Sequence, residues 1–448
     1  MRESGRGEEN WREEILKDLG KLHPQEVIRA CGRVREDLSS VENRKRILEM
    51  LSAGGLAEEE DKSRMESAFL AMSPEYLEGR MKREFGPEWV EEFSPGLSDW
   101  EAGKTGCFEE NGRRYRQKWR PLGVLFHIGA GNMDGISAFS ALEGLLTGNI
   151  NLVKLPGGGD PVSRWLVERL FEAEPKLRRY LRLFPVSSAE LDAMRELADA
   201  ADGIVVWGGD EAVQAVRRLA DPGARLIEWG NRLSFAYVPA AALHGPEEEL
   251  AAQLKLLARH VAETDQLLCS SCQGVYVDTE KGSDLMRVGR LFLAALEREL
   301  GRRRRGSFRE GDGLELLRRQ ALLALEVRTA QLESIRGEKR VLRGDGCSVT
   351  VFRDSCLEPS LQYGNPWVRP LPSGQVLSGL RPYRGRLQTV SILCQDRAEE
   401  ELRETFFRAG AVRITAPDRM SSGYSGEPHD GEMPLRRYVK RISVEMAL

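Results

Sequence analysis

Short apolar segments alternate with helical segments along the middle of the chain, and this alternation limits the fold more than any other feature. Apolar segments with β character lie at 123–128, 151–155, 203–207 and 234–238, and stretches of helical spacing separate them. Strands that alternate with helices predict a parallel sheet built from βαβ crossovers. We therefore expect an α/β protein that binds its ligands at the carboxyl ends of these strands.

The composition describes a globular protein without signs of a nucleic-acid or membrane partner. The chain has 448 residues, enough for two or three domains, and its formal net charge is -4. Nucleic-acid binding needs a concentrated basic face, which this charge balance does not favour. No stretch approaches ~18 consecutive apolar residues, and the charged N-terminus lacks a signal pattern. Because seven scattered cysteines are not typical of a disulfide framework, we expect a cytoplasmic protein.

Residues outside the alternating segments show other patterns. Residues 1–100 are rich in Glu, Arg and Leu at helical spacing, which predicts several amphipathic helices. Asn111-Gly112 separates two β-type segments and predicts a hairpin turn. A helix is expected around 312–325, and we interpret the preceding Arg302–Arg305 cluster as a solvated loop in preference to a phosphate site.

A glycine-rich turn follows the first strand of the alternation. Gly129, Gly131 and Gly135 lie between the strand at 123–128 and a helical stretch. Their spacing fails the G-x-G-x-x-G fingerprint of dinucleotide-binding folds, which would need glycine where Asp134 stands. A tight strand-to-helix turn explains the same glycines. The turn still marks the edge of the sheet at which α/β proteins bind ligands.

Cys269 and Cys272 form a Cys-x-x-Cys pair in a loop between a helical segment and an apolar strand. A zinc site would need two more ligands at suitable spacing, and the remaining cysteines and the histidines are scattered singly. A thioredoxin-like redox pair would need a small βαβ domain around it. The pair could also consist of cysteines that only fill the core, or Cys269 could be a single nucleophilic thiolate with Cys272 as a backup thiol.

Two strand ends each allow two interpretations. Gly208, Gly209 and Asp210 follow the strand at 203–207. They either bind an anion at the start of the next helix or form a plain turn with Asp210 as the N-cap. Glu228 ends another apolar strand, where it could act as a general base. We favour a salt-bridged carboxylate there.

Two histidines are placed by their surroundings. His127 lies inside an apolar strand and is expected to be a core residue whose ring nitrogens are hydrogen-bonded. His429 lies in the turn Pro428-His429-Asp430-Gly431, and by itself that pattern indicates only a loop.

Taken together and in order, these segments resemble the aldehyde dehydrogenase superfamily, and within it the acyl-CoA reductase branch of the bacterial bioluminescence fatty acid reductase complex. The segments that carry the resemblance are PLGVLFHIGAGN (121–132), LEGLLTGNINLVKLP (142–156), VVWGGDEAV (205–213), LIEWGNRLSFAYV (226–238), DQLLCSSCQGVYV (265–277) and PHDGEMPLRR (428–437). Their order and spacing are specific over roughly residues 105–440.

The resemblance implies catalytic roles for individual residues. Cys269 matches the catalytic cysteine, and Asn132 matches the asparagine whose amide forms the oxyanion hole together with the backbone N–H of that cysteine. Glu228 aligns with the glutamate that activates the deacylating water in hydrolytic members, a water that reductive members do not need. His429 belongs to the PHDG signature, without an assigned role.

The resemblance also implies a cofactor site, and the scattered cysteines and histidines predict no metal site. Lys154 matches the lysine that contacts the adenosine ribose and could favour a 2′-phosphate. Gly209 and Asp210, preceded by Gly208, match a Gly-Ser turn near the cofactor diphosphate, and the aspartate departs from that pattern. Gly131 of the glycine-rich turn completes the expected set of cofactor-binding residues.

The implied fold is α/β and aldehyde dehydrogenase-like, with an open parallel-sheet cofactor domain. The expected parts are an N-terminal helical region packed on the cofactor domain (1–104), a β-hairpin oligomerisation arm (105–120), a nicotinamide-cofactor-binding domain (121–243), an α/β catalytic domain carrying the cysteine (244–425) and a C-terminal tail (426–448). The superfamily binds nicotinamide cofactors without the standard glycine fingerprint, so the irregular spacing after Gly129 is expected.

The implied function is NADPH-dependent reduction of an acyl thioester, either acyl-CoA or acyl-protein, to an aldehyde through an acyl-enzyme on Cys269. NADH is the second possible cofactor, an acyl-protein synthetase is a candidate partner, and a homo-oligomer is expected. Three different functions stay open: an oxidative aldehyde dehydrogenase, CoA-acylating or hydrolytic; a non-catalytic scaffold that binds an acyl-activating partner; and a zinc-binding module.

Overall fold

The computed structural model of the chain divides into two compact units. It describes residues 12–52, 70–94, 104–129, 135–156, 160–302, 325, 329, 339–394 and 400–446. The first unit combines residues up to Leu51, a segment that ends at Gly230 and the chain from Ser425 on, and the second unit contains Asn231–Tyr424. The predicted boundary at residue 243 differs from this division, because the strand Leu233–Val238 pairs within the sheet of the second unit.

The first unit is built on a five-stranded sheet in the order β5-β4-β3-β6-β7, with every pair parallel. Its strands are β3 (Val124–Ile128), β4 (Ile150–Lys154), β5 (Leu181–Phe184), β6 (Gly203–Trp207) and β7 (Arg225–Trp229). The predicted βαβ alternation is therefore confirmed. Because the chain first moves to one side of β3 and then to the other, the strand order reverses between β3 and β6. Open α/β sheets bind ligands at the carboxyl ends of the strands beside such a reversal.

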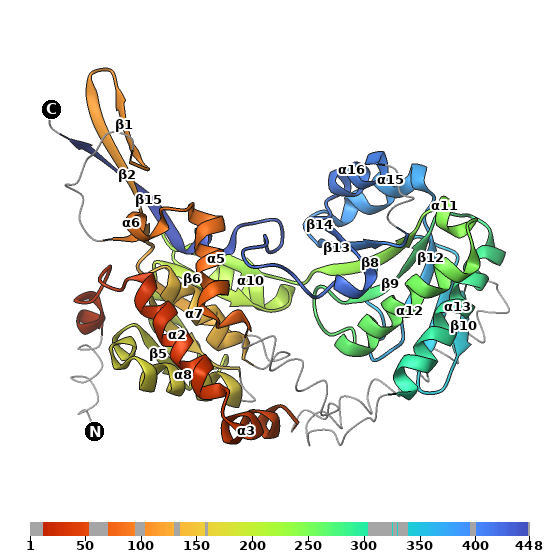
Figure 1. The fold of residues 1–448 in the computed structure, drawn as a ribbon, viewed down its shortest axis with the longest axis horizontal. Coiled ribbons are helices and arrows are strands. Elements are labelled where there is room, and N and C mark those ends of the chain that lie inside the picture. Colours follow the sequence, from red (N-terminus) through yellow and green to blue (C-terminus); the bar gives the residue numbers. More distant parts are fainter. Residues whose placement is uncertain are drawn as a thin grey trace. The chain divides into compact units, whose positions relative to one another are not determined.

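Helices cover this sheet, and the N-terminal helices share its core. The helical elements of the unit are α2 (Pro24–Leu38), α3 (Val41–Ser52), α5 (Pro74–Phe85), α6 (Trp89–Phe93), α7 (Ile136–Leu146), α8 (Pro161–Ala173), η1 (Pro175–Arg179), α9 (Leu191–Asp199), α10 (Asp210–Leu219) and η6 (Pro434–Tyr438). One hydrophobic cluster joins Val27 of α2 and Leu77 of α5 to Phe126 of β3 and Tyr438 near the C-terminus. In Figure 1, α2 runs alongside α7 and α8.

A three-stranded antiparallel sheet, in the order β1-β2-β15, extends from this unit (Figure 1). The predicted hairpin is present: β1 (Cys107–Glu110) and β2 (Arg113–Pro121) are joined by Asn111 and Gly112, both at positive φ, as a tight hairpin turn requires. The predicted C-terminal tail contains a strand that was not predicted, β15 (Val439–Met446), which pairs with β2 along its whole length.

Buried polar groups in the first unit are held by specific partners. His127 is fully buried, and its ring nitrogens contact Ser140 Oγ at 2.7 Å and Asn151 Oδ1 at 2.9 Å, which confirms it as a hydrogen-bonded core residue. Glu84 on α5 is also fully buried and accepts a hydrogen bond from Arg436 N. Burial, only partly offset by Arg80, raises the pKa of Glu84 to about 7.

The second unit is built on a seven-stranded sheet in the order β10-β11-β12-β9-β8-β13-β14. Its strands are β8 (Leu233–Val238), β9 (Cys272–Val277), β10 (Lys339–Arg343), β11 (Ser348–Phe352), β12 (Trp367–Pro370), β13 (Leu387–Ile392) and β14 (Arg413–Thr415). The pairs are parallel except β10 with β11. Two strands away from the edges, β9 and β13, are buried along their whole length, as expected of a sheet covered on both faces.

Two hydrophobic clusters cover the two faces of this sheet. One face packs against α12 (Glu247–Thr264) and α13 (Gly282–Gly301), and the other against α15 (Val376–Leu380) and α16 (Glu400–Ala409). The remaining short elements are α11 (Ala240–Leu243), η2 (Ser373–Gln375), η3 (Arg381–Tyr383) and η5 (Pro417–Arg419). Arg303–Arg305 and almost all of the helix expected at 312–325 lie outside the described residues.

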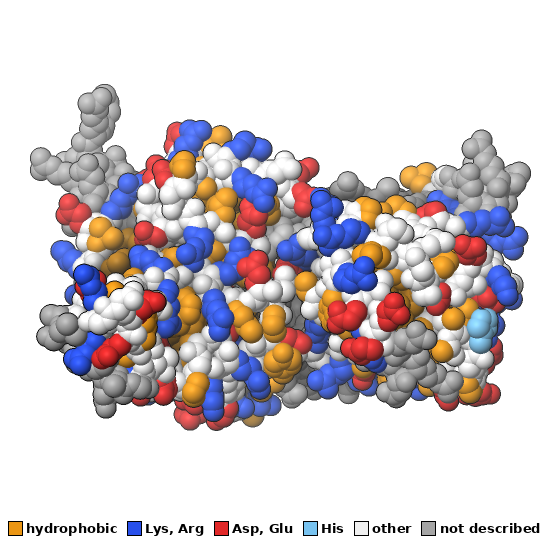
Figure 2. Space-filling view, turned by 90° about the horizontal axis from the view of Figure 1, so that it is seen from above, with side chains coloured by type: hydrophobic (Ala, Val, Ile, Leu, Met, Phe, Trp, Pro, Cys, Tyr) orange, Lys and Arg blue, Asp and Glu red, His pale blue; other side chains and the backbone are white. Residues whose placement is uncertain are grey.

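Basic and acidic side chains are mixed over the face seen in Figure 2, and neither sign gathers over one large area. Among the described helices, none is long and apolar enough to cross a membrane. Within the same described residues, no group of three His, Cys, Asp or Glu side chains is placed to hold a metal ion.

Candidate active site

Cys269 lies in a short loop between α12 and β9, where its side chain is partly exposed. The loop begins with Asp265 and Gln266, which both have positive φ, at 47° and 61°. Residues other than glycine adopt this conformation at an energetic cost, so surrounding contacts must hold it. The chain reverses sharply here, and the reversal brings Cys269 to the end of the sheet.

Buried side-chain amides hold the loop from both ends. Gln266 Nε2 donates to Cys272 O at 2.9 Å, and Gln266 Oε1 accepts from Asn365 N at 3.1 Å. Gln273 Nε2 donates to Gln266 O and Ser271 O, both at 3.2 Å. Since all of these groups are buried or partly buried, each unmade hydrogen bond would leave a polar group without water. The loop is therefore fixed before any substrate arrives.

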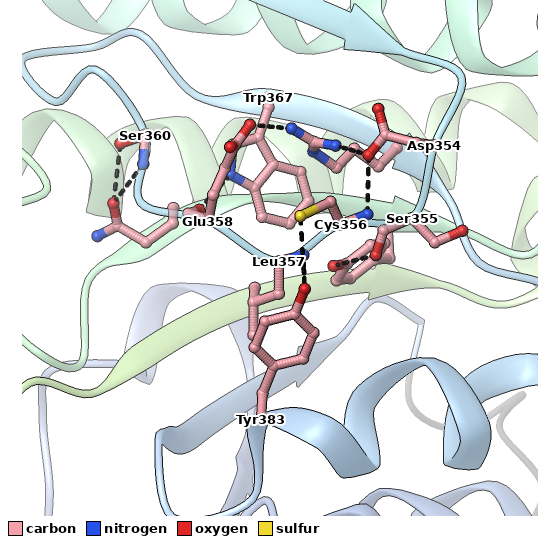
Figure 3. A network of polar contacts seen from close by, with 11 residues as sticks. Asp354, Ser355, Cys356, Leu357, Glu358, Ser360, Trp367 and Tyr383 are labelled. Carbon is pink, nitrogen blue, oxygen red and sulfur yellow. Dashed lines mark hydrogen bonds and ion pairs between the residues drawn. The ribbon is translucent and has the colours of Figure 1, made fainter.

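A second network, drawn in Figure 3, supports Gln273 from outside the loop. Ser360 donates from its N and Oγ to Gln273 Oε1, at 3.0 and 2.9 Å. The segment around Ser360 is held in turn by Arg369, a buried side chain that forms ion pairs with Asp354 and Glu358. Trp367 Nε1 also donates to Glu358 O at 3.0 Å. Supporting contacts of this kind keep a reactive side chain in one position.

The same network borders a cavity of about 470 Å³, and Cys269 is not among its described lining residues. The thiol at this cavity is Cys356, which is exposed and lies 3.4 Å from Tyr383 Oη. No sequence pattern marks this thiol, because Cys356 stands alone in an irregular segment.

Sequence analysis also missed two residues that contact Cys269 directly, because no motif marks them. Gln388 Nε2 lies 3.2 Å from Cys269 Sγ, and Ser234 Oγ donates to Cys269 O at 2.8 Å.

Cys272 does not share the environment of Cys269. It begins β9, is fully buried, and its Sγ donates to Gly274 O at 3.2 Å. Burial raises the pKa of its thiol to about 12. This burial disfavours Cys272 as the expected backup thiol, because the thiolate is the nucleophile and burial opposes its formation. All the cysteines lie in the described part of the chain, and none of them forms a disulfide.

In the first unit, the described cofactor candidates and the catalytic candidate Glu228 lie at one edge of the sheet. Lys154 ends β4, Gly208 follows β6, and Glu228 lies at the end of β7. Because these strands are parallel, their carboxyl ends meet at the edge where the strand order reverses. Asn132 and Gly131 lie outside the described residues, and the roles of all the predicted site residues remain predictions.

The two glycines that flank residues 130–134, Gly129 and Gly135, are closely packed or hydrogen-bonded. A Cβ atom on Gly129 would lie 2.2 Å from Ser137 Oγ, so a larger residue there would have to displace this hydroxyl. Gly135 has a φ of 84° and is the N-cap of α7, and its N–H donates to Asp160 Oδ1 at 3.1 Å. These contacts require glycine for packing and turn geometry, as the interpretation of a tight strand-to-helix turn expects.

Lys154 is almost completely buried, with 3% of its surface exposed. Within the described part of the chain, its ammonium has no hydrogen bond or ion pair. Burial lowers the pKa of Lys154, because the charged form loses its hydration. A buried cation needs an anionic partner to offset this loss, so the position is suited to a negatively charged ligand.

At the next strand end, Gly209 is the N-cap of α10 and Asp210 is the first helical residue, without a side-chain cap hydrogen bond. The expectation that Asp210 is the N-cap is therefore wrong. Gly208 N donates to Trp229 O at 3.2 Å and ties the turn to β7. The first turn of α10 leaves backbone N–H groups at the sheet edge, where they can face an anion.

Glu228 forms a bidentate ion pair with Arg217 of α10, at 2.5 and 2.6 Å. This pairing is what the salt-bridge interpretation expects. Its assignment as a catalytic base stays a prediction that the ion pair disfavours, since a general base must be available to take a proton.

His429 lies beside an aromatic pair at the same edge. Trp207 and Trp229 are stacked with ring centroids 5.4 Å apart, and the imidazole meets them edge-on at 5.8 and 4.7 Å. The guanidinium of Arg437 lies 4.9 Å from the ring centroid of Trp229. The fold thus brings His429 next to the strand ends that carry Gly208 and Glu228, a proximity that the sequence separation of these residues concealed.

Comparison with known proteins identifies the family of the chain. The model of a family described as Acyl-CoA reductase (LuxC) matches residues 19–441. The chain is 26% identical over 343 residues to a long-chain acyl-protein thioester reductase of Aliivibrio fischeri, which covers 73% of this chain and 65% of that protein. It is 23% identical over 359 residues to the corresponding protein of Vibrio harveyi, which covers 78% and 70%. The chain therefore spans only part of the length of these relatives.

Solved structures are similar in fold at low identity. Aldehyde dehydrogenase 21 of Physcomitrella patens has a TM-score of 0.68 at 12% identity, with 98% of this chain and 90% of that chain covered. A glyceraldehyde-3-phosphate dehydrogenase of Methanocaldococcus jannaschii, solved with NADP, has a TM-score of 0.68 at 10% identity, with 98% and 94% covered. With its aldehyde dehydrogenase-like α/β fold, the chain belongs to the acyl-CoA reductase (LuxC) family.

Proposed function

We propose that this protein is an NADPH-dependent reductase of acyl thioesters, either acyl-CoA or acyl-protein, and that it forms an aldehyde through an acyl-enzyme on Cys269. The observation that carries the proposal is the partly exposed Cys269 thiol on a loop fixed by buried amides. Acyl transfer to an enzyme needs an accessible nucleophile in a fixed position. The names of the relatives, long-chain acyl-protein thioester reductases, support the same substrate class.

The reaction begins at the thiolate of Cys269. Its Sγ attacks the thioester carbonyl carbon, the bond from that carbon to the departing thiol breaks, and the acyl group becomes a thioester of Cys269. We assign the developing oxyanion to the side-chain amide of Asn132 and the backbone N–H of Cys269. The bound nicotinamide cofactor supplies the hydride that reduces this thioester. Cys269 then leaves as a thiolate and releases the aldehyde.

A nicotinamide dinucleotide fits the carboxyl edge of the first unit's sheet. Lys154 offers a buried ammonium that lacks an anionic partner among the described residues, and we assign it to the adenosine ribose and its 2′-phosphate. This assignment favours NADPH over NADH. We assign the diphosphate to the backbone at Gly208 and Gly209, with Gly131 opposite. Asp210 contributes its N–H, because its carboxylate would repel the phosphates.

The ion pair of Glu228 with Arg217 favours the reductive reaction over the hydrolytic one. Hydrolysis needs a free carboxylate to activate water, and this carboxylate already accepts two hydrogen bonds. The proposal also includes a cytoplasmic location, a homo-oligomer that uses the β1-β2-β15 sheet, and an acyl-protein synthetase as one source of the acyl group.

The test is NADPH oxidation with a panel of acyl-CoAs, followed by the near-ultraviolet absorbance of NADPH and by detection of the aldehyde. We expect oxidation that depends on chain length in the wild type and in Cys272→Ala, and none in Cys269→Ala. If the wild type reduces neither acyl-CoAs nor an acyl-protein made by an acyl-activating synthetase, the reductase is refuted and a non-catalytic scaffold takes its place. Full turnover in Cys269→Ala would refute the assigned nucleophile.

A further inference from the structure

We propose that Gln388 is a further catalytic residue, whose side-chain N–H donates a hydrogen bond to the Cys269 thiolate when this thiolate attacks and again when it leaves. The inference rests on the proposed function of Cys269. It adds a donor for the sulfur, whereas the assigned oxyanion hole serves the carbonyl oxygen.

The first observation is the contact itself. Gln388 Nε2 lies 3.2 Å from Cys269 Sγ, within the range of a hydrogen bond to sulfur. Gln388 is buried, with 7% of its surface exposed, so water competes little for its amide. A hydrogen bond to a charged acceptor is roughly twice as strong as one between neutral groups. The amide therefore stabilises the thiolate more than the thiol.

The second observation is a pair of irregularities in the sheet beside this contact. Leu387 pairs with Leu233 and Val390 with Phe235, so β13 advances three residues while β8 advances two. The extra residue falls at Gln388 and the residue after it. A bulge of this kind turns a side chain out of the regular alternation, and bulges are common beside active sites.

Ser234 lies opposite this bulge and joins it to the cysteine loop. Its hydroxyl accepts a hydrogen bond from Thr389 N at 3.0 Å and donates to Cys269 O at 2.8 Å. On the other side of β8, Ser234 pairs with Cys272 and Ala236 with Val275, so β9 also carries one extra residue at this level. One buried hydroxyl thus fixes the bulge that carries Gln388 relative to the backbone of Cys269.

The chemistry gives this donor two tasks. Before acylation, it raises the fraction of Cys269 present as the nucleophilic thiolate. After reduction, the carbon–sulfur bond of the Cys269 thiohemiacetal breaks, its electron pair returns to Sγ, and the hydroxyl proton leaves to solvent as the C=O bond forms. The same N–H then stabilises the departing thiolate. In the acyl-enzyme, the thioester sulfur is a poor acceptor, so the donor does not oppose reduction.

The test is the pH dependence of Cys269 alkylation by iodoacetamide in the full chain, read by mass spectrometry of the peptide that contains this cysteine. A Cys356→Ser background removes the exposed thiol. Loss of a hydrogen bond to a thiolate is worth about one pH unit. We therefore expect Gln388→Met, which keeps the length of the side chain and loses the donor, to move the alkylation midpoint up by about one unit. Gln388→Glu should move it further, because a carboxylate repels the thiolate.

Two other residues of the chain serve as controls. Buried Cys272 lies in the same peptide region and stays unmodified only while the fold is intact, and Gln375→Met makes the same replacement at a surface position of the same unit. An unchanged midpoint in either Gln388 variant with Cys272 protected would overturn the proposal. Should Gln388→Met expose Cys272, the isosteric Gln388→Glu decides. Failure of the reductase itself appears separately, as a wild type without turnover but with a normal alkylation profile.

Discussion

Replacement of Gln273 by methionine should loosen the Cys269 loop without removing any reacting atom. The Gln273 side chain makes four hydrogen bonds, two to the carbonyls of Gln266 and Ser271 and two from Ser360. A buried hydrogen bond contributes about 1 kcal/mol, so the four together contribute about 4 kcal/mol. Methionine has a similar length and recovers some of this by apolar contact. We therefore expect local opening of the loop to become about 3 kcal/mol easier.

Hydrogen exchange of the backbone amides at residues 265–273 measures this local opening directly. A change of about 3 kcal/mol corresponds to exchange that is roughly 150-fold faster, confined to the loop and to the segment around Ser360. Gln375→Met is the matched control, because that side chain is exposed and has a single hydrogen bond, to Glu280. It should leave exchange in the loop unchanged. Equal exchange in Gln273→Met and the wild type would show that these amide contacts do not hold the Cys269 loop.

Three further predictions concern other residues. The pKa of Glu84 is raised to about 7 in the folded protein, so its stabilising contribution is complete below pH 4.5 and is lost as the pH rises through 7. Glu84→Gln should then raise the free energy of unfolding of the first unit by about 3 kcal/mol at pH 8 and by little at pH 5. Thermal unfolding at both pH values measures this, and a difference between variant and wild type that does not change with pH would contradict it. Glu228→Gln should change the reductase rate less than threefold and stability by at most about 1 kcal/mol; a loss of a hundredfold or more in steady-state assays would restore its role as a base. Cys272→Ala should retain acylation and reduction, and loss of both in a folded variant would show that this buried thiol takes part.

Much of the fold was predictable because its signals are local. The strands β3, β6 and β8 are short apolar segments bounded by glycine or turn residues, and the Asn111-Gly112 turn has only one common use between strands. The partner of β2 was not predictable. β15 follows β2 by more than three hundred residues, alternates weakly, and gains its order from pairing. The sequence also did not reveal the boundary after Gly230. The strand β8 resembles its neighbours in sequence, and only its pairing assigns it to the second sheet.

The position of a candidate residue in the fold was predictable where an ordered segment contains it. Cys269 and Lys154 stand in segments whose order is specific, and the shared sheet edge of Gly208 and Glu228 follows from parallel strands. The position of His429 beside that edge needed the structure, because its turn belongs to none of these strands. Gln388 was not predictable, because a glutamine in a buried strand has no motif and its direction depends on a one-residue bulge. The difference between Cys269 and Cys272 also needed the structure, since two cysteines three residues apart differ in burial.

If Cys269 carries the acyl group, the mass of its peptide after incubation with an acyl-CoA and without reduced cofactor shows it directly. We expect one acyl group on the peptide that contains Cys269, labile to hydroxylamine, absent in Cys269→Ala, and lost with release of aldehyde when NADPH is added. An acyl group on another cysteine, or equal labelling of Cys269→Ala, would contradict it.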